Sequence, residues 1–168
     1  MSLLFQIFAH TPLWVWLVLV LVLGLGLLGL RPRALPPWRL GILPLVGIGT
    51  SVSGIVQSPR PSLAFAAWFV ALLAGLPLGH AAGRRRPARL LEDGRLAVAG
   101  GWFMLLFGLS IFAVRYTLGV LFGVAPALKA EPAWIGLAAG IGGVIAGIGI
   151  GWLAGLLRQA RRSPAAVG

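Results

Sequence analysis

The sequence predicts an all-α, polytopic membrane protein with five transmembrane helices, and three observations lead to this prediction. The 168 residues are 59% hydrophobic, and only 10% carry a charged side chain. The mean hydropathy is +0.98. A chain this apolar cannot keep its surface in water, so a soluble globular protein is excluded. The 14 basic residues stand mostly in short clusters between uncharged runs, which is the pattern that sets membrane topology.

Five uncharged runs approach the roughly 20 helical residues that a bilayer core about 30 Å thick requires. The first begins after Thr11, a suitable N-cap, with Pro12 at the first helical position, where its missing N–H does no harm. Pro44 and Pro77 lie inside the second and third runs and predict bends there. The expected spans, within a single membrane domain of residues 1–168, are 12–30, 38–57, 62–83, 101–124 and 132–157.

Basic residues divide unevenly between the two sides of these spans. One side carries only Arg60 and Lys129, and the other carries eleven arginines. The positive-inside rule places the arginine-rich side in the cytoplasm. We therefore expect a bacterial-type inner-membrane protein with its amino terminus outside and its carboxyl terminus inside. The eleven are Arg31, Arg33, Arg39, Arg84, Arg85, Arg86, Arg89, Arg95, Arg158, Arg161 and Arg162.

The loop between the third and fourth spans carries a turn signal. Asp93 and Gly94 stand between two short apolar segments, and Gly94 can adopt a positive φ at little cost. We expect a small cytoplasmic hairpin at this position.

Small residues recur every four positions in the third and fifth spans. Each strip lets another helix approach closely, which is how helices gain contact in lipid. Both spans run from outside to inside, so the two strips can pair in parallel within one chain, or one of them can join two copies of the chain. The strips are Ala67, Ala71, Gly75, Gly79 and Gly83, and Gly143, Gly147, Gly151 and Gly155.

Arg115 is the charged residue that falls inside an expected span, where a charge costs about 2.5–3.5 kcal/mol on insertion scales. It lies roughly 13 Å from the outer end of its helix at about 1.5 Å per residue. Polar residues share this outer half. If Arg115 turns toward them, the group forms a cationic pocket for a lipid phosphate or another small anion. The candidate contacts are Arg115, Tyr116, Ser51, Ser53, Gln57 and His10.

A second interpretation of the same residues needs no pocket. The long side chain of Arg115 can extend to the outer headgroups, while serine and threonine hydroxyls bind carbonyls of their own helix. Ser53 and Gln57 are four residues apart and therefore share a helix face. His10 lies beside an aromatic segment and is typical of a membrane boundary. Both interpretations remain open at this stage.

The composition favours a protein that is not an enzyme. The chain has no cysteine, three acidic residues and two histidines, and no acidic residue falls in an expected span. We therefore expect no catalytic residue, no cofactor and no metal site. The expected partners are membrane lipids and not nucleic acid, with a homo-oligomer or a larger membrane complex left open. The leading function is anion or lipid binding, or an accessory role in a complex; the alternative is a small transporter or channel that acts as an oligomer.

Several short motifs stand along the chain: His10-Thr11-Pro12-Leu13-Trp14-Val15-Trp16, Leu30-Arg31-Pro32-Arg33, Leu43-Pro44-Leu45, Ser51-Val52-Ser53-Gly54 and Arg115-Tyr116. Together they resemble a bacterial family of small polytopic inner-membrane proteins, classed as a domain of unknown function. The resemblance covers most of the chain, and its opening motif is the most specific. It implies a multi-span fold and implies no activity.

Overall fold

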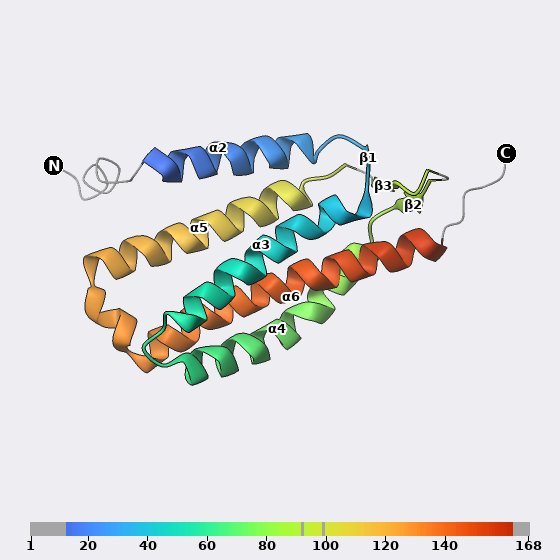
Figure 1. Cartoon of the computed structure of the whole chain (residues 1–168). Helices are drawn as coiled ribbons and strands as arrows, with labels where there is room; N and C mark the ends of the chain where they lie inside the picture. Colours follow the sequence, from blue (N-terminus) through green and yellow to red (C-terminus); the bar gives the residue numbers. More distant parts are fainter. Residues whose placement is uncertain (1–12, 92, 99, 163–168) are drawn as a thin grey trace. The chain divides into compact units, whose positions relative to one another are not determined.

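The computed structural model describes residues 13–91, 93–98 and 100–162 (Figure 1). Within these ranges the protein is mostly helical, and each expected span overlaps an α-helix whose ends differ from the expected ones by a few residues. Residue 12 of the first span lies outside the described residues. The elements are α2 (Leu13–Leu28), β1 (Arg33–Leu35), α3 (Pro37–Val56), α4 (Pro61–Arg84), β2 (Ala88–Leu90), β3 (Leu96–Val98), α5 (Phe103–Val124), the 3₁₀ helix η1 (Pro126–Ala130) and α6 (Pro132–Arg162).

Three of these helices are long and apolar enough to cross a membrane, namely Pro61–Arg84, Leu105–Val124 and Pro132–Arg161. Helices α2 and α3 contribute shorter apolar stretches, Val15–Leu28 and Gly47–Val56. A mostly helical chain with helices suited to cross a membrane is confirmed at this level. The five spans and their orientation stay predictions.

The contacts between residues divide the chain into two compact units. Unit 1 contains Met1–Pro32 and Gly100–Pro126, and unit 2 contains Arg33–Ala99 and Ala127–Gly168. We describe each unit by itself. The single membrane domain expected from the sequence stays a prediction.

Unit 1 is an antiparallel pair of helices, α2 and α5. A Cβ added at Gly26 would lie 2.5 Å from Leu105 Cδ1, and one added at Gly108 would lie 3.1 Å from Val22 Cγ1. The two contacts run in opposite directions along the two helices, as an antiparallel pair requires. Beyond the helix ends, the N–H of Gly101 donates to the carbonyl of Gly29 at 3.1 Å and joins the two segments that follow α2 and precede α5.

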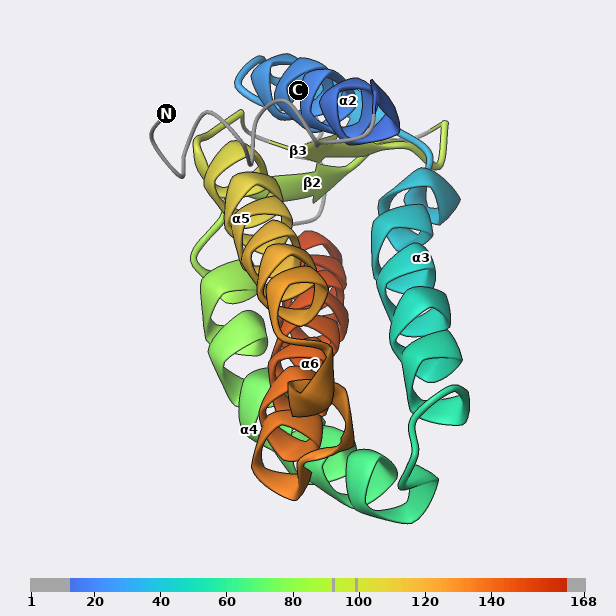
Figure 2. The same ribbon diagram turned by 90° about the vertical axis from the view of Figure 1, so that its left-hand side faces the viewer.

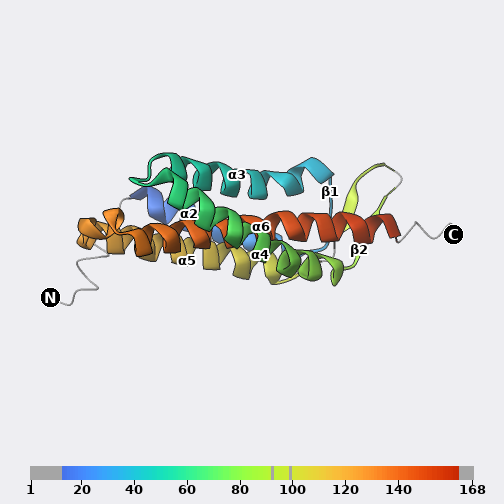
Figure 3. The ribbon, with the colours of Figure 1, turned by 90° about the horizontal axis from the view of Figure 1, so that it is seen from below.

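Unit 2 is built on the parallel pair α4 and α6, which lie side by side in Figures 1 and 3. The two glycine strips face each other, which confirms the pairing within one chain that the sequence offered. A Cβ added at Gly79 or Gly83 would lie under 3.0 Å from main-chain atoms of α6, and one added at Gly147 or Gly151 would lie under 3.0 Å from main-chain atoms of α4. Because these neighbours are backbone, only glycine permits this approach.

The register of the α4–α6 pair is regular over its whole length. Gly75, Gly79 and Gly83 meet Val144, Ile148 and Trp152 in turn, so each step of four residues on α4 matches four on α6. Such a match requires parallel helices. Van der Waals contact between backbones is the main source of helix association where lipid removes the hydrophobic drive.

A disulfide can test this register, because the chain has no cysteine of its own. The Cβ of Ala71 lies 3.9 Å from the Cβ position of residue 140, within the range of about 3.5–4.5 Å that a disulfide requires. We expect the double variant Ala71→Cys and Gly140→Cys to crosslink readily within one chain under mild oxidation, as seen by a mobility shift on a non-reducing gel.

The matched control for this disulfide combines Ala71→Cys with Gly136→Cys. Gly136 is one turn earlier on α6, and a Cβ added there has no neighbour within 4 Å. It should stay reduced under the same conditions. A crosslinked dimer in place of the intramolecular product would show that the strips join two copies of the chain instead.

Helix α3 runs antiparallel to α6 in unit 2 (Figure 3). A Cβ added at Gly41 would lie 4.0 Å from Leu153 Cδ2, and one added at Gly142 would lie 3.1 Å from Ser51 Oγ, so the contacts follow opposite directions along the two helices. The buried core where α3, α4 and α6 meet contains Ile55, Ala64, Trp68, Ile135 and Ala146.

Unit 2 also contains a three-stranded sheet, of which strands β2 and β3 follow α4 (Figure 2). Strands β2 and β3 form the expected hairpin, with Leu90 opposite Leu96 and Gly94 at φ +75° in the turn. The hairpin is therefore confirmed, while its cytoplasmic location stays a prediction. The sequence did not predict β1, which pairs with the other edge of β3 and places Arg33 opposite Val98.

Candidate functional site

Ser51 points into the core of unit 2. Its side chain is buried, and its hydroxyl donates to the carbonyl of Gly47 at 2.8 Å. The neighbouring surface of α6 is Gly142, where an added Cβ would lie 3.1 Å from Ser51 Oγ. The bond from Ser51 to Gly47 is the one that serine commonly forms in helices with the carbonyl four residues earlier. Ser51 therefore packs against α6.

Ser53 and Gln57 lie on an exposed face of the same helix and bind each other. Gln57 Nε2 donates to Ser53 Oγ at 2.9 Å and to the Ser53 carbonyl at 3.2 Å. Residues two positions apart in an α-helix, such as Ser51 and Ser53, are separated by about 200° of rotation about the helix axis. Ser53 is thus on a different face of α3 from Ser51, and the polar residues of α3 do not form one common surface.

Arg115 is exposed on α5 in unit 1. It stands seven residues, or about two helical turns, after Gly108. A Cβ added at Gly108 would contact Val22 of α2. The backbone of Arg115 therefore lies on the same side of α5 as Gly108, the side that faces α2. The ring of Tyr116 stacks on Phe112, with centroids 6.0 Å apart and planes 8° from parallel. These residues give α5 a cationic and aromatic segment in its second half.

The proposed contacts are divided between the two units. Arg115 and Tyr116 belong to unit 1, and Ser51, Ser53 and Gln57 belong to unit 2. A pocket that would join them spans both units, so it stays a prediction. His10 lies outside the described residues.

Trp68 is a buried polar residue that the sequence did not single out. It is 8% exposed, and its indole N–H has no hydrogen-bond partner among the described residues. An unsatisfied buried donor costs about 1–3 kcal/mol. Its Cδ1 would lie 3.8 Å from a Cβ added at Gly142, which places the indole close to Ser51. An indole in a span carries no sequence signal of its burial, because tryptophan is also common at membrane boundaries.

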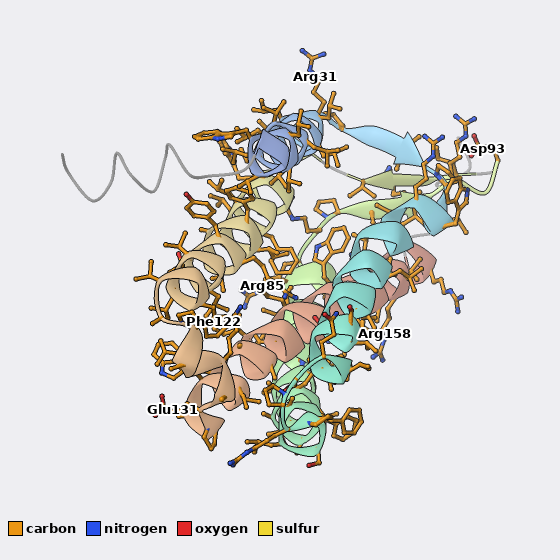
Figure 4. All side chains as sticks on the ribbon, turned by 60° about the vertical axis from the view of Figure 1, so that its left-hand side comes forward. Arg31, Arg85, Asp93, Phe122, Glu131 and Arg158 are labelled. Carbon is orange, nitrogen blue, oxygen red and sulfur yellow. The ribbon has the colours of Figure 1, made fainter. Side chains whose placement is uncertain are left out.

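Six arginines gather at the end of unit 2 where α4 and α6 terminate, and we call this group the arginine end. Gly155 of α6 packs on the last turn of α4, where an added Cβ would lie 3.0 Å from the main-chain nitrogen of Arg84. The close contact of the helices therefore brings together arginines that are far apart in the sequence. Figure 4 labels Arg85, which directly follows α4, and Arg158 of α6. The arginine end consists of Arg84, Arg85, Arg86, Arg89, Arg158 and Arg161.

The acidic residues that the structure describes are Asp93 and Glu131. Asp93, at the tip of the hairpin (Figure 4), binds Arg95 with 3.4 Å between Oδ2 and Nε, and also accepts the N–H of Arg95 at 3.0 Å. Glu131 precedes α6 and so lies at its opposite end. In the sequence, these arginines indicate the orientation of the chain. Their convergence could not be found without the pairing of α4 with α6.

Among the described residues, no group of three or more histidines, cysteines and acidic residues could hold a metal ion. Comparison with family models, with curated proteins and with solved structures gives no significant match. The function is therefore inferred from the residues of the chain itself. The resemblance to a bacterial membrane family stays a prediction.

Proposed function

We propose that this chain is a five-span inner-membrane protein that binds anionic lipid and is not an enzyme, with its amino end outside and its carboxyl end in the cytoplasm. One observation carries the lipid-binding proposal: Arg115 is an exposed arginine on α5, a helix long and apolar enough to cross a membrane. In this orientation, Arg115 is roughly 13 Å from the outer end of α5.

An anionic group can offset part of the cost of placing an exposed guanidinium at this depth. The long side chain of arginine can extend along the helix toward the headgroups. A lipid phosphate there can accept two parallel hydrogen bonds from the guanidinium, a geometry that lysine cannot reproduce. Arg115 is therefore proposed as the contact with a phosphate of the outer leaflet.

Transport by an oligomer is the alternative, and the packing of unit 2 favours it less. Pro77 is the kink site that the sequence suggested in the third span, but it lies within an α4 that continues from Pro61 to Arg84. This helix is held against α6 through backbone contacts on both sides of Pro77, at Gly75 and Gly79. A helix fixed in this way suits a rigid binding or accessory protein better than a moving gate.

Native mass spectrometry of Arg115→Leu tests the lipid-binding proposal. With phosphatidylglycerol as the probe, we expect this variant to lose one bound lipid that the unaltered chain retains. Arg115→Lys should retain part of the binding, because the charge remains while the paired hydrogen bonds are lost. Arg60→Leu is the matched control, because it removes one exposed arginine outside the helices. Equal phosphatidylglycerol binding by Arg115→Leu and the unaltered chain would exclude Arg115 as the contact.

A further inference from the structure

We propose that the arginine end of unit 2 is a binding site for the headgroup of an anionic lipid that carries two phosphates. This site is separate from Arg115 and does not depend on the proposal made for it. In the topology proposed above, it faces the cytoplasmic leaflet. The contact between α4 and α6 near the end of α4, which we call the frame, fixes the positions of the arginines.

The frame is the part of the α4–α6 contact nearest the end of α4. Gly83 meets the main chain of α6 at Trp152 and Leu156, and Gly155 meets the main chain of α4 at His80 and Arg84. Arg84 and Arg158 therefore extend from two backbones whose separation is set by glycine contacts. A binding site needs groups held in place by a rigid support, and this pair supplies one.

Strand β2 extends the frame beyond the end of α4. It packs against α6, with Ala88 of the strand 2% exposed and Ala160 of the helix 3% exposed. Neighbouring residues in a strand point to opposite faces, so Arg89 points away from the face that buries Ala88. Arg89 and Arg161 are both exposed. The last turn of α6 thus adds the exposed Arg161 to the first pair, whereas Arg89 points away from α6.

An exposed tryptophan indicates the depth of this end. Trp38 begins α3 and is 64% exposed, and the guanidinium of Arg39 lies over its ring, 5.4 Å from the centroid. Since α3 runs antiparallel to α6, the beginning of α3 lies toward the end of α6. Tryptophan is enriched at headgroup level in membrane proteins. The arginine end is therefore at the level where lipid phosphates are found.

Two phosphates match the division of the arginines between α4 and α6. Arginine binds phosphate through paired hydrogen bonds. One phosphate can accept hydrogen bonds from only a few guanidinium groups, whereas two linked phosphates offer acceptor oxygens to more of the arginines of α4 and α6. Orientation of the chain depends on the number of basic residues in each loop and does not require this convergence. Basic pockets between helices on the cytoplasmic side are known to take lipids of this class.

The test measures binding of cardiolipin, which has two phosphates, against phosphatidylglycerol, which has one, by native mass spectrometry of the full chain. The variant combines Arg84→Gln with Arg158→Gln and so removes one arginine from each helix. We expect its affinity for cardiolipin to fall at least about tenfold, with a much smaller change for phosphatidylglycerol. The control of equal charge combines Arg60→Gln with Arg95→Gln, two exposed arginines outside the arginine end, and should retain cardiolipin binding.

Folding is checked by adding the Ala71→Cys and Gly140→Cys pair to each variant, since the crosslink forms only when α4 and α6 remain paired. A correctly crosslinked Arg84 and Arg158 variant that binds cardiolipin like the control would overturn the proposal. Equal binding of cardiolipin and phosphatidylglycerol by the unaltered chain would also overturn it, because the end would then act only as a diffuse positive charge. Neither result affects Arg115, which is tested with phosphatidylglycerol and a different variant.

Discussion

Gly79→Leu is expected to separate α4 from α6 and to lower the thermal unfolding temperature by roughly 10 °C. A Cβ at this position would lie under 3.0 Å from three main-chain atoms of Ile148, and backbone cannot give way as a flexible side chain can. Overpacking costs about 1–3 kcal/mol and sometimes more, and about 1 kcal/mol shifts the midpoint by about 2–4 °C in a chain of this size. We expect the destabilisation by Gly79→Leu to reach or exceed the upper end of this energy range, because the rest of the leucine side chain must also fit between the two backbones.

The measurement is the unfolding midpoint of the purified protein in detergent, with Gly147→Leu as a second variant on the facing strip. A Cβ at Gly147 would contact main-chain atoms of Leu72 and Gly75, so the same loss is expected. Gly136→Leu is the control, because it lies on α6 but has open space around it. Gly26 cannot serve as a control, since it packs on Leu105. Equal midpoints for Gly79→Leu and Gly136→Leu would contradict the packing.

Repeating patterns in the sequence predicted the helices and the α4–α6 contact well, because both depend on features that are local along the chain. An uncharged run of about 20 residues has few alternatives to a helix in lipid. A glycine at every fourth position, as in Gly143 and Gly147, marks one face of a helix whatever the rest of the fold. Asp93 and Gly94 similarly determine a turn from their own backbone preferences.

The polar residues were harder to place, because their environment depends on how each helix is rotated about its axis. Ser51 and Ser53 look equivalent in the sequence, yet one contacts α6 and the other is exposed. Strand β1 was missed because three residues carry no period of their own, and its partner β3 lies more than 60 residues later. The arginine end depends in addition on the register of α4 against α6, which sets Gly155 beside Arg84.

The orientation of the chain is expected to give an all-or-none result with topology reporters. Eleven arginines fall on one side of the five proposed spans, and Arg60 and Lys129 fall on the other. Basic residues in short loops resist transfer across the membrane, so the arginine-rich side should remain in the cytoplasm. The same asymmetry is visible along α6 in unit 2: the arginine end lies at one end of this helix, and Lys129 lies before its other end.

A reporter active only in the cytoplasm should therefore be active when fused after Gly168 and inactive when fused before Met1. A periplasmic reporter fused at the same two positions should give the opposite pattern. A truncated chain that ends at Ala130, within η1, places the junction before α6 and should reverse the result obtained at Gly168. The Arg84 and Arg158 double variant should keep the original pattern, because nine arginines still oppose two basic residues. Periplasmic activity after Gly168 would rule out five spans in this orientation, and with them the assignment of the arginine end to the cytoplasmic leaflet.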